Sequence, residues 1–351
     1  MSSKWTLVTG ANGFLGARLV RRLVERGEKV KALVRAGANL RELRDLPSSQ
    51  VKIAVGDVRM MDRVFAGLRN CDTMYHVAAT YSFDERRSRE IMEDSVEGTE
   101  AALEAARHAG VEKIVVTSSI AALGTTQEPE AMTEEAEFNL GDCNSYSAAK
   151  HAAEKFALDQ VKKGLPVVVV NPAAIVGPGD WKPTPTGRQI VDYLGHSPSF
   201  RMPYPRGGLC YVDVDDVADG HIAAMEKGRV GERYILGGDN LTMKEMLELL
   251  SDVTGLAEPG GELSLGKAKI VATVSECLSR WTGGPPLLTS KMVQDFYGTY
   301  SYANSDKARK ELGYNPRSAR KAFARACRWY LDNGYIADKA ARRARLELIS
   351  A

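Results

Sequence analysis

The first half of this 351-residue chain alternates between continuous apolar runs and segments with helical periodicity. The apolar runs are Trp5–Thr9, Val30–Val34, Val51–Val55, Thr73–Val77, Lys113–Thr117 and Val167–Asn171. The segments with the period of a helix are Phe14–Arg26, Val96–His108 and Ala148–Lys163. Strands that are apolar throughout are typical of parallel sheets covered on both faces, and their connections are right-handed. The pattern predicts an α/β fold with a doubly wound parallel sheet.

The pattern changes after Asn171, where residues 171–187 are rich in proline and glycine and predict a shaped loop. Further helices are expected at Arg188–Leu194, Val214–Met225, Lys244–Asp252, Ser305–Leu312 and Ala319–Asp332, with a strand at Glu232–Leu236. We predict a first domain over residues 1–175, to which a strand and helix return from about 210–237. A smaller, interleaved second domain is expected mainly over 176–335, followed by a terminal helix or tail over 336–351.

Composition excludes several classes of protein. With 44% hydrophobic and 26% charged residues the chain has the composition of a soluble globular protein, and a net charge of +2 gives no footprint for nucleic acid. No apolar run reaches the ~18 residues that span a bilayer, and a strand at residue 5 leaves no room for a signal peptide. The five cysteines form no CxxC pair and the histidines no HExxH motif, so we expect no disulfide framework and no metal site. A reducing, cytoplasmic location follows from this.

Three glycines spaced three residues apart, Gly10, Gly13 and Gly16, lie between the first strand and the first helix. Glycine destabilises a helix or strand by about 0.5–1 kcal/mol relative to alanine, so its use at three positions indicates that the turn needs backbone freedom or a ligand must lie against bare backbone. In a doubly wound sheet this turn is where a dinucleotide pyrophosphate lies against a helix N-terminus. We expect Gly10 to allow the tight turn, Gly13 the approach of phosphate, and Gly16 the close packing of helix on strand.

Further motifs follow the glycine turn in a fixed order. They are GDVR at Gly56–Arg59, HVAA at His76–Ala79, VVTSS at Val115–Ser119, YSAAK at Tyr146–Lys150 and NPAAIVGP at Asn171–Pro178. With the GxxGxxG spacing of the turn, this order resembles the extended short-chain dehydrogenases/reductases of the NAD-dependent epimerase/dehydratase superfamily, over about residues 4–335. The resemblance implies a Rossmann-type first domain that binds NAD(P) and a second domain that binds a small-molecule substrate.

The YSAAK motif points to proton transfer. Moving a hydride between nicotinamide and a carbinol carbon leaves one proton on oxygen to be handled, and the ordinary pKa of tyrosine is ~10. Lys150 lies one helical turn after Tyr146, where its ammonium attracts a phenolate by about 4 kcal/mol. We therefore expect Tyr146 to be the acid/base and Lys150 to lower its pKa toward neutrality. The resemblance implies Ser119, five residues before Gly124, as the third catalytic residue.

The resemblance also implies a set of cofactor contacts. Arg35 follows the second strand where an acidic residue would bind the ribose of NAD, so we expect it to bind a 2′-phosphate and favour NADP, with NAD as the alternative. The remaining expected contacts are Asn12, Phe14 and Leu15 in the glycine turn, Asp57 and Val58 beside adenine, Ala78, Ala79, Thr80 and Thr117 along the cofactor, Tyr146 and Lys150, and Pro172, Ala173 and Ala174 beside nicotinamide.

Two branches of the family remain open for the substrate. Nucleotide-sugar epimerases and dehydratases hold a diphosphate with arginines, but Leu209, Val293 and Gln294 stand at the matching positions. The KPTPTGR and GERYILGG stretches resemble the dihydroflavonol-reductase and 3β-hydroxysteroid-dehydrogenase relatives, including bacterial hopanoid-associated sugar epimerases. This favours an oxidoreductase acting on a small apolar substrate. A non-catalytic NADP-sensing protein is the third possibility.

Two surfaces are candidates for contacts with partners. Residues 263–284 form an amphipathic segment with Lys267, Lys269 and Arg280, which either touches a membrane surface or lipid substrate or covers the substrate domain. The resemblance implies a homodimer formed through the helices at Val96–His108 and Ala148–Lys163.

Overall fold

The computed structural model describes residues 5–197, 199–283, 286 and 288–336. The terminal helix or tail expected over 336–351 lies, apart from its first residue, outside this part of the chain. None of the helices in the described ranges combines the length and the apolar character needed to cross a membrane.

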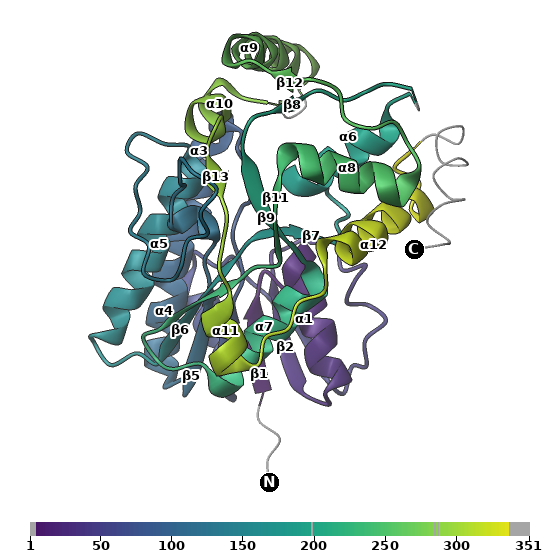
Figure 1. Cartoon of the computed structure of the whole chain (residues 1–351). Coiled ribbons are helices and arrows are strands. Elements are labelled where there is room, and N and C mark those ends of the chain that lie inside the picture. The colour runs from purple at the N-terminus through teal and green to yellow at the C-terminus, as the bar shows by residue number, and fades with distance from the viewer. Residues whose placement is uncertain (1–4, 198, 284–285, 287, 337–351) are drawn as a thin grey trace.

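A parallel sheet of seven strands forms the centre of the molecule (Figure 1), in the order β10-β6-β5-β4-β1-β2-β3. Its strands are β1 (Trp5–Thr9), β2 (Lys29–Val34), β3 (Val51–Val55), β4 (Cys71–His76), β5 (Lys113–Thr117), β6 (Val167–Pro172) and β10 (Arg233–Leu236). Strand order reverses on either side of β1, which is the arrangement of a doubly wound Rossmann-type sheet. The predicted fold class is confirmed.

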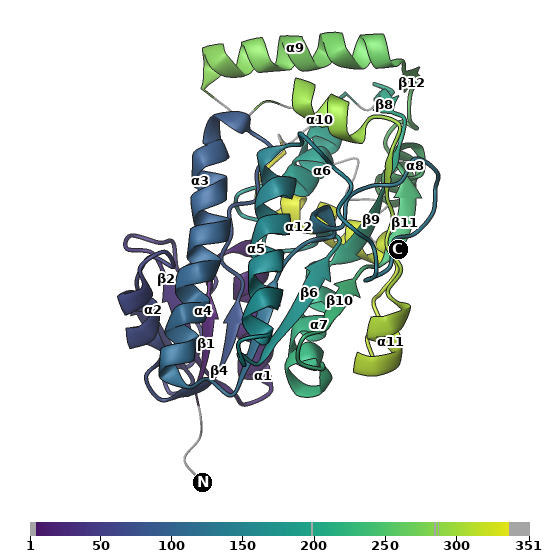
Figure 2. The same cartoon turned by 90° about the vertical axis from the view of Figure 1, so that its left-hand side faces the viewer.

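Helices cover both faces of this sheet because successive residues of each strand point to opposite sides. Val8 and Ala32 pack toward α1 (Phe14–Glu25) and α7 (Val214–Lys227), while Leu7 and Leu33 pack toward the other layer. That layer, in front of the sheet in Figure 2, consists of α2 (Met61–Leu68), α4 (Gly98–Ala109) and α5 (Ser145–Val161). Short helical segments complete it, namely η1 (Glu85–Arg87), α3 (Ser88–Met92), η2 (Glu93–Glu97) and η3 (Ile120–Ala122).

A second, smaller lobe packs at the carboxyl end of the main sheet. Its strand β9 (Gly208–Asp213) pairs with β11 (Asp239–Thr242), β13 (Tyr300–Ser301) and β7 (Ala174–Val176). The helices around it are α6 (Pro185–Gly195), α8 (Met243–Thr254) and α12 (Ala319–Asp332), and α11 (Asp306–Leu312) lies beside α7. At the far end are β8 (Tyr204–Pro205), β12 (Glu262–Leu263), α9 (Leu265–Thr282) and α10 (Ser290–Phe296). The lobe is interleaved with the first, because α7 and β10 return to the main sheet.

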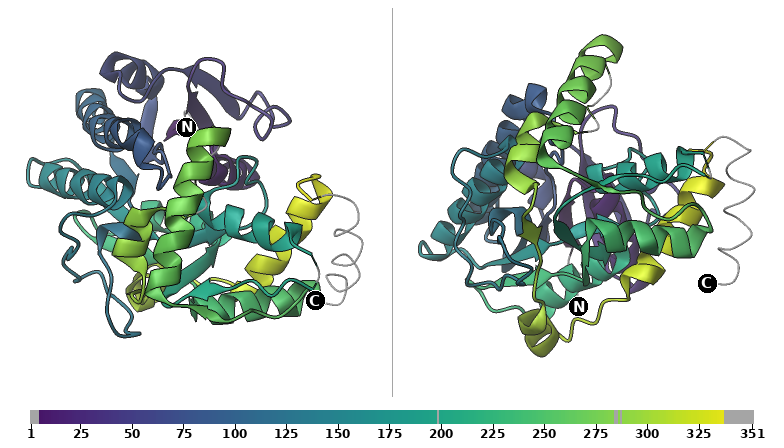
Figure 3. Two further views of the ribbon diagram at one scale, coloured as in Figure 1. Left: turned by 90° about the horizontal axis from the view of Figure 1, so that it is seen from above. Right: turned by 45° about the horizontal axis from the view of Figure 1, so that its top comes forward.

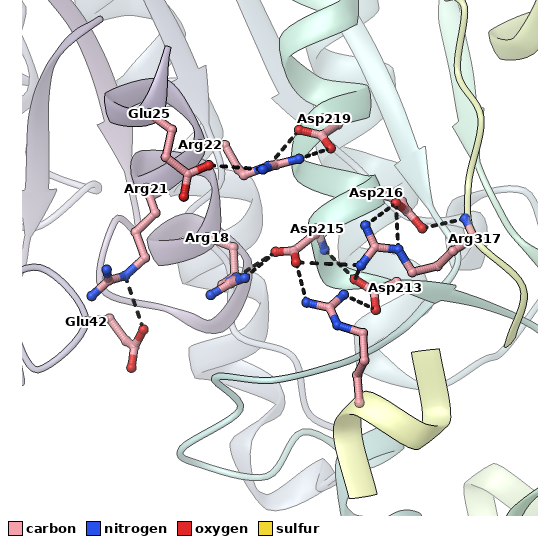
Figure 4. Close-up of polar contacts among 11 residues, drawn as sticks. Arg18, Arg21, Arg22, Glu25, Glu42, Asp213, Asp215, Asp216, Asp219 and Arg317 are labelled. Atoms are coloured by element: carbon pink, nitrogen blue, oxygen red, sulfur yellow. Dashed lines mark hydrogen bonds and ion pairs between the residues drawn. The ribbon is translucent and has the colours of Figure 1, made fainter. Parts of the chain in front are cut away.

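A cluster of ion pairs joins the two lobes (Figure 4). Asp213, at the end of β9, is fully buried, and its carboxylate accepts a hydrogen bond of 2.6 Å from Arg325 of α12. Arg317, in the loop before α12, lies 3.4 Å from the same carboxylate. The neighbouring Asp215 accepts a hydrogen bond of 2.7 Å from Arg18 of α1 and a second one from Arg325. The cluster therefore ties the first helix of the sheet to the last helix of the second lobe.

We predict that Arg325→Met destabilises the protein. A buried carboxylate that loses a partner is costly, and because Arg317 remains near Asp213 we expect the low end of the usual range, about 3 kcal/mol. Urea denaturation measures the change. Arg320→Met is the matched control, since this residue of the same helix forms an exposed pair, 3.7 Å from Asp252, and its loss should cost under about 1 kcal/mol. Equal midpoints for the two variants would contradict the prediction.

Candidate active site

The glycine turn after β1 lies against bare backbone on two sides. Gly10 has φ +64°, and a Cβ there would lie 2.7 Å from Cα of Ala78. A Cβ on Gly16 would lie 2.1 Å from the carbonyl oxygen of Gly10. Thr9 fixes the contact with β4, because its hydroxyl accepts hydrogen bonds of 3.1 Å from the amides of Val77 and Ala78. Side chains at Gly10 and Gly16 would therefore push the turn away from β4 and from α1.

The N-terminus of α1 is free of competing groups. Its N-cap, Gly13, has no side chain to bond the first amides, and the first turn contains no acidic residue. Gly13 is exposed, whereas Asn12 and Phe14 beside it are half-buried and Leu15 is buried. A helix N-terminus with unshared amides attracts a phosphate group. These residues fit the pyrophosphate of a dinucleotide cofactor.

The other expected cofactor residues lie along the carboxyl edge of the sheet. Parallel strands end at the same edge, so the residues after them come together although they are far apart in sequence. Around this edge the structure places Arg35 after β2, Asp57 and Val58 after β3, Ala78, Ala79 and Thr80 after β4, Thr117 at the end of β5, and Pro172, Ala173 and Ala174 at the end of β6 and the start of β7.

Two arginines form ion pairs with acidic side chains at this edge of the sheet. The Arg35 guanidinium is largely exposed and lies 3.8 Å from Asp94. Arg59 is held more firmly, 2.7 Å from Asp57 and 3.0 Å from Glu93. The hydrogen bond from Arg59 holds the pKa of Asp57 below its ordinary value. Arg59 was not among the expected site residues, because a basic residue in a short motif does not reveal which charge it faces.

Helix α5 positions the tyrosine and lysine. Its N-cap Asn144 is fully buried, accepts a hydrogen bond of 2.9 Å from the amide of Ser147 and donates to Asp295. Tyr146 is therefore held in the first turn of α5, and Lys150 lies one turn later on the same face. Both side chains are buried, and Lys150 Nζ donates a hydrogen bond of 3.0 Å to the carbonyl of Thr117.

Burial controls the protonation of this pair. It raises the pKa of Tyr146 above its ordinary value, with a further increase from Tyr81, while a hydrogen bond with Ser119 acts in the opposite direction. Burial lowers the pKa of Lys150 to about 8. Burial therefore acts against the expected lowering of the Tyr146 pKa by Lys150, and that lowering stays a prediction. Loss of hydration disfavours both charged forms, and one of the three N–H donors of Lys150 is bonded to the carbonyl of Thr117.

A buried hydrogen-bond chain supports Ser119 and Lys150 from behind. The Asn171 amide donates to the carbonyl of Ser119 (3.1 Å) and to the Glu154 carboxylate (2.5 Å). Glu154, one turn after Lys150, also accepts a hydrogen bond of 2.8 Å from Arg233 and raises the pKa of Lys150. Sequence reasoning did not assign Glu154 a role, although its spacing of eight residues from Tyr146 places it on the same helical face.

Aromatic side chains surround Tyr146. The ring centroids of Tyr81 and Phe83 lie 4.8 Å and 5.5 Å from that of Tyr146, and Phe296 of α10 lies 5.7 Å from Phe83. Tyr81 and Phe83 follow β4 in an irregular segment, where sequence periodicity gives no signal. The arrangement encloses the phenol in an apolar wall.

Comparison with known proteins agrees with this geometry. The model of the NAD dependent epimerase/dehydratase family matches residues 6–237. A putative dihydroflavonol 4-reductase of Synechocystis sp. is 36% identical over 335 residues, covering 94% of this chain and 95% of that protein. Sterol demethylase protein B of Methylococcus capsulatus is 34% identical, covering 94% and 99%. The crystal structure of gox2253 has a TM-score of 0.81 at 37% identity, covering 95% and 100%.

The glycine turn at the first strand, the residues gathered at the carboxyl edge and these relatives lead to one conclusion. The chain belongs to the NAD-dependent epimerase/dehydratase family and is an NAD(P)-dependent enzyme of the extended short-chain dehydrogenase/reductase type.

Proposed function

We propose that this enzyme is an NADP-dependent reductase of a carbonyl group on a small apolar substrate. The observation that carries the proposal is the hydrogen bond of the half-buried Ser119 with the buried Tyr146, beside the wall of Tyr81 and Phe83. A hydroxyl pair in an apolar wall suits a substrate oxygen attached to an apolar body.

The chain's own residues supply the proton. When bound, the cofactor supplies the hydride to the carbonyl carbon. Ser119 holds the substrate oxygen, and Tyr146 donates its proton to that oxygen as negative charge develops. Because burial raises its pKa, Tyr146 keeps its proton at neutral pH and is ready to act as the acid. Lys150, with a pKa of about 8, is charged at neutral pH and favours the phenolate that forms.

The cofactor is expected to lie along the carboxyl edge of the sheet. The turn from Gly10 to Gly16 would hold the pyrophosphate, with Asn12, Phe14 and Leu15 beside it. The other expected contacts keep their assignments, from Asp57 and Val58 at adenine to Pro172–Ala174 at nicotinamide. The exposed Arg35 would bind the 2′-phosphate of NADP, because Asp94 engages it only at 3.8 Å.

Of the three arginines that could hold a sugar diphosphate, two are engaged elsewhere and the third, Arg206, is exposed. Arg188 donates to Asp192 at 2.8 Å and Arg201 to Glu258 at 2.9 Å, both at the surface. Leu209 stands on β9 where an epimerase would have its arginine. These observations, together with the name of the Synechocystis relative, favour carbonyl reduction over nucleotide-sugar chemistry. The homodimer through α4 and α5 remains a prediction.

Tyr146→Phe tests the mechanism. The fold and NADP affinity should persist, because only a hydroxyl is removed, while turnover should fall by ~10²–10⁴-fold or more with the loss of the acid. The measurement is steady-state ketone reduction with NADPH. Tyr234→Phe is the control. Tyr234 lies at the start of β10, away from the carboxyl edge, and its hydroxyl donates a hydrogen bond of 2.8 Å to Glu311. Near-full activity of Tyr146→Phe would show that the proton comes from another group.

Arg35→Asp tests the cofactor assignment. The substitution removes a charged hydrogen bond to the 2′-phosphate and adds repulsion, so the preference for NADP over NAD should fall by at least about ten-fold. Binding titrations with both cofactors measure the ratio. The exposed Arg69, which lies before β4 at the opposite edge of the sheet, provides the control Arg69→Asp. An unchanged ratio in Arg35→Asp would remove Arg35 from the site.

Glu154→Gln tests the electrostatic role of the buried carboxylate. Reduction should decline as pH rises through about 8, because Lys150 then loses its proton while Tyr146 keeps its own. Without the charge of Glu154, which raises the pKa of Lys150, this decline should begin at lower pH. The pH profile of kcat/KM gives both midpoints, with exposed Glu100→Gln as control. If kcat/KM falls at every pH while the midpoint of the profile stays unchanged, the role of Glu154 is purely structural.

A further inference from the structure

We propose that helix α9 docks this enzyme on the surface of an anionic lipid bilayer. The lipid-facing side consists of Ile270, Val274, Leu278 and Trp281, which we call the outer stripe. The docking itself does not depend on the proposed reaction and goes beyond it.

Helix α9 has two apolar faces on opposite sides. Ala268 and Ala272 are buried and pack with Val293 of α10. The outer stripe follows a spacing of four, four and three residues, which keeps its members on one face of a helix. On a helical wheel that face is opposite Ala268 and Ala272. Residue spacing therefore separates the side that covers the protein from the side that faces outward.

The outer stripe is exposed in the described part of the chain. Ile270 is 65% exposed, Leu278 58% and Trp281 94%. Single exposed apolar residues are ordinary, but a row of them on one face marks an interaction surface. Tryptophan is favoured at the boundary between water and lipid, where its ring is apolar and its N–H remains hydrated.

The charges of α9 select the type of lipid. The helix carries Lys267, Lys269 and Arg280 and a single acidic residue, Glu276. Glu276 is engaged with Ser290, whose amide donates to it at 2.7 Å. Basic residues next to an apolar face are typical of helices that lie on membranes with anionic headgroups. The charge therefore supports an anionic bilayer as the occupant.

The size and position of the stripe also favour a bilayer over a second copy of the chain. The stripe is about 16 Å long and about 10 Å wide, far smaller than the ~800 Å² that each partner of a stable complex buries. Figures 1 and 2 show α9 as the outermost element at the top of the molecule. In the left picture of Figure 3, which is the view from above, no other helix or strand of the described residues covers it. A flat lipid surface can therefore meet the stripe along its whole length.

Helix α9 is also connected to the candidate active site. It packs on α10, whose Phe296 contacts Phe83, and Phe83 contacts Tyr146. On the other side, Arg86 of η1 donates to the carbonyl of Ser279. If the proposed function holds, the docked enzyme would place its apolar wall close to the layer in which an apolar substrate dissolves.

Co-sedimentation with vesicles tests the docking. The full chain should pellet with phosphatidylcholine vesicles that contain phosphatidylglycerol, and much less with phosphatidylcholine alone. Ile270→Gln combined with Leu278→Gln should weaken binding at least about ten-fold, since each substitution removes an apolar side chain from the contact. Lys267→Glu with Lys269→Glu should remove the preference for the anionic vesicles. Val230→Gln is the control, because Val230 is exposed outside α9 and its substitution should change nothing.

Tryptophan fluorescence gives an independent measurement. Trp281 is far more exposed than Trp5, Trp181 and Trp329, so a blue shift on adding anionic vesicles should come from it. Trp281→Phe should lose the shift while still pelleting. The α9 variants should retain wild-type reduction of a water-soluble ketone, which separates a docking failure from a failure of the proposed reaction.

Three outcomes would overturn the proposal. The first is wild-type protein that does not pellet with anionic vesicles, and the second is a variant with both glutamine substitutions that pellets as well as the wild type. The third is self-association in solution that Ile270→Gln with Leu278→Gln abolishes while vesicles have no effect, which would identify a second copy as the occupant.

Discussion

The contact between the glycine turn and the end of β4 is the constraint on which the rest of the structure depends. Gly10 can lie against Ala78 only without a side chain, and Gly16 approaches the same turn from α1. Together they fix where α1 begins and in which direction it runs. Helix α1 then carries Arg18 to Asp215, and Asp215 shares Arg325 with the buried Asp213. A turn suited to a cofactor is thus connected through one charged cluster to the lobe that closes over the site.

Removal of water has opposite effects on the two titratable groups of the site. It raises the pKa of Tyr146 and lowers that of Lys150, because in each case the charged form loses hydration. The direction for Tyr146 favours the protonated phenol that reduction requires. Glu154 limits the effect on Lys150, and through Asn171 it also holds the backbone of Ser119. A single buried carboxylate therefore supports both charge and position.

Sequence reasoning succeeded where one physical rule acts along a short stretch. Strands β1, β3 and β5 begin and end at the predicted residues, because each is a short apolar run flanked by polar residues or glycine. The cofactor contacts at the carboxyl edge were expected from the resemblance to the family, and they remain predictions. Sequence reasoning did not predict strand β9, because its partners β7, β11 and β13 come from distant parts of the chain. It also missed the wall of Tyr81 and Phe83, which depends on an irregular segment, and the pKa of Tyr146, which depends on burial.

For helix α9 the sequence left two interpretations open, and the structure is compatible with both at once. Residues 263–284 suggested either a cover for the second lobe or a membrane contact, because both need an amphipathic helix. The inner alanines, Ala268 and Ala272, are small enough to let α9 lie close on α10. The residues of the outer stripe are on the opposite face, where they are exposed. A helix needed only as a cover would gain solubility by having polar residues there. The inner face therefore accounts for the cover, and the docking proposed above would give the outer stripe a partner of its own.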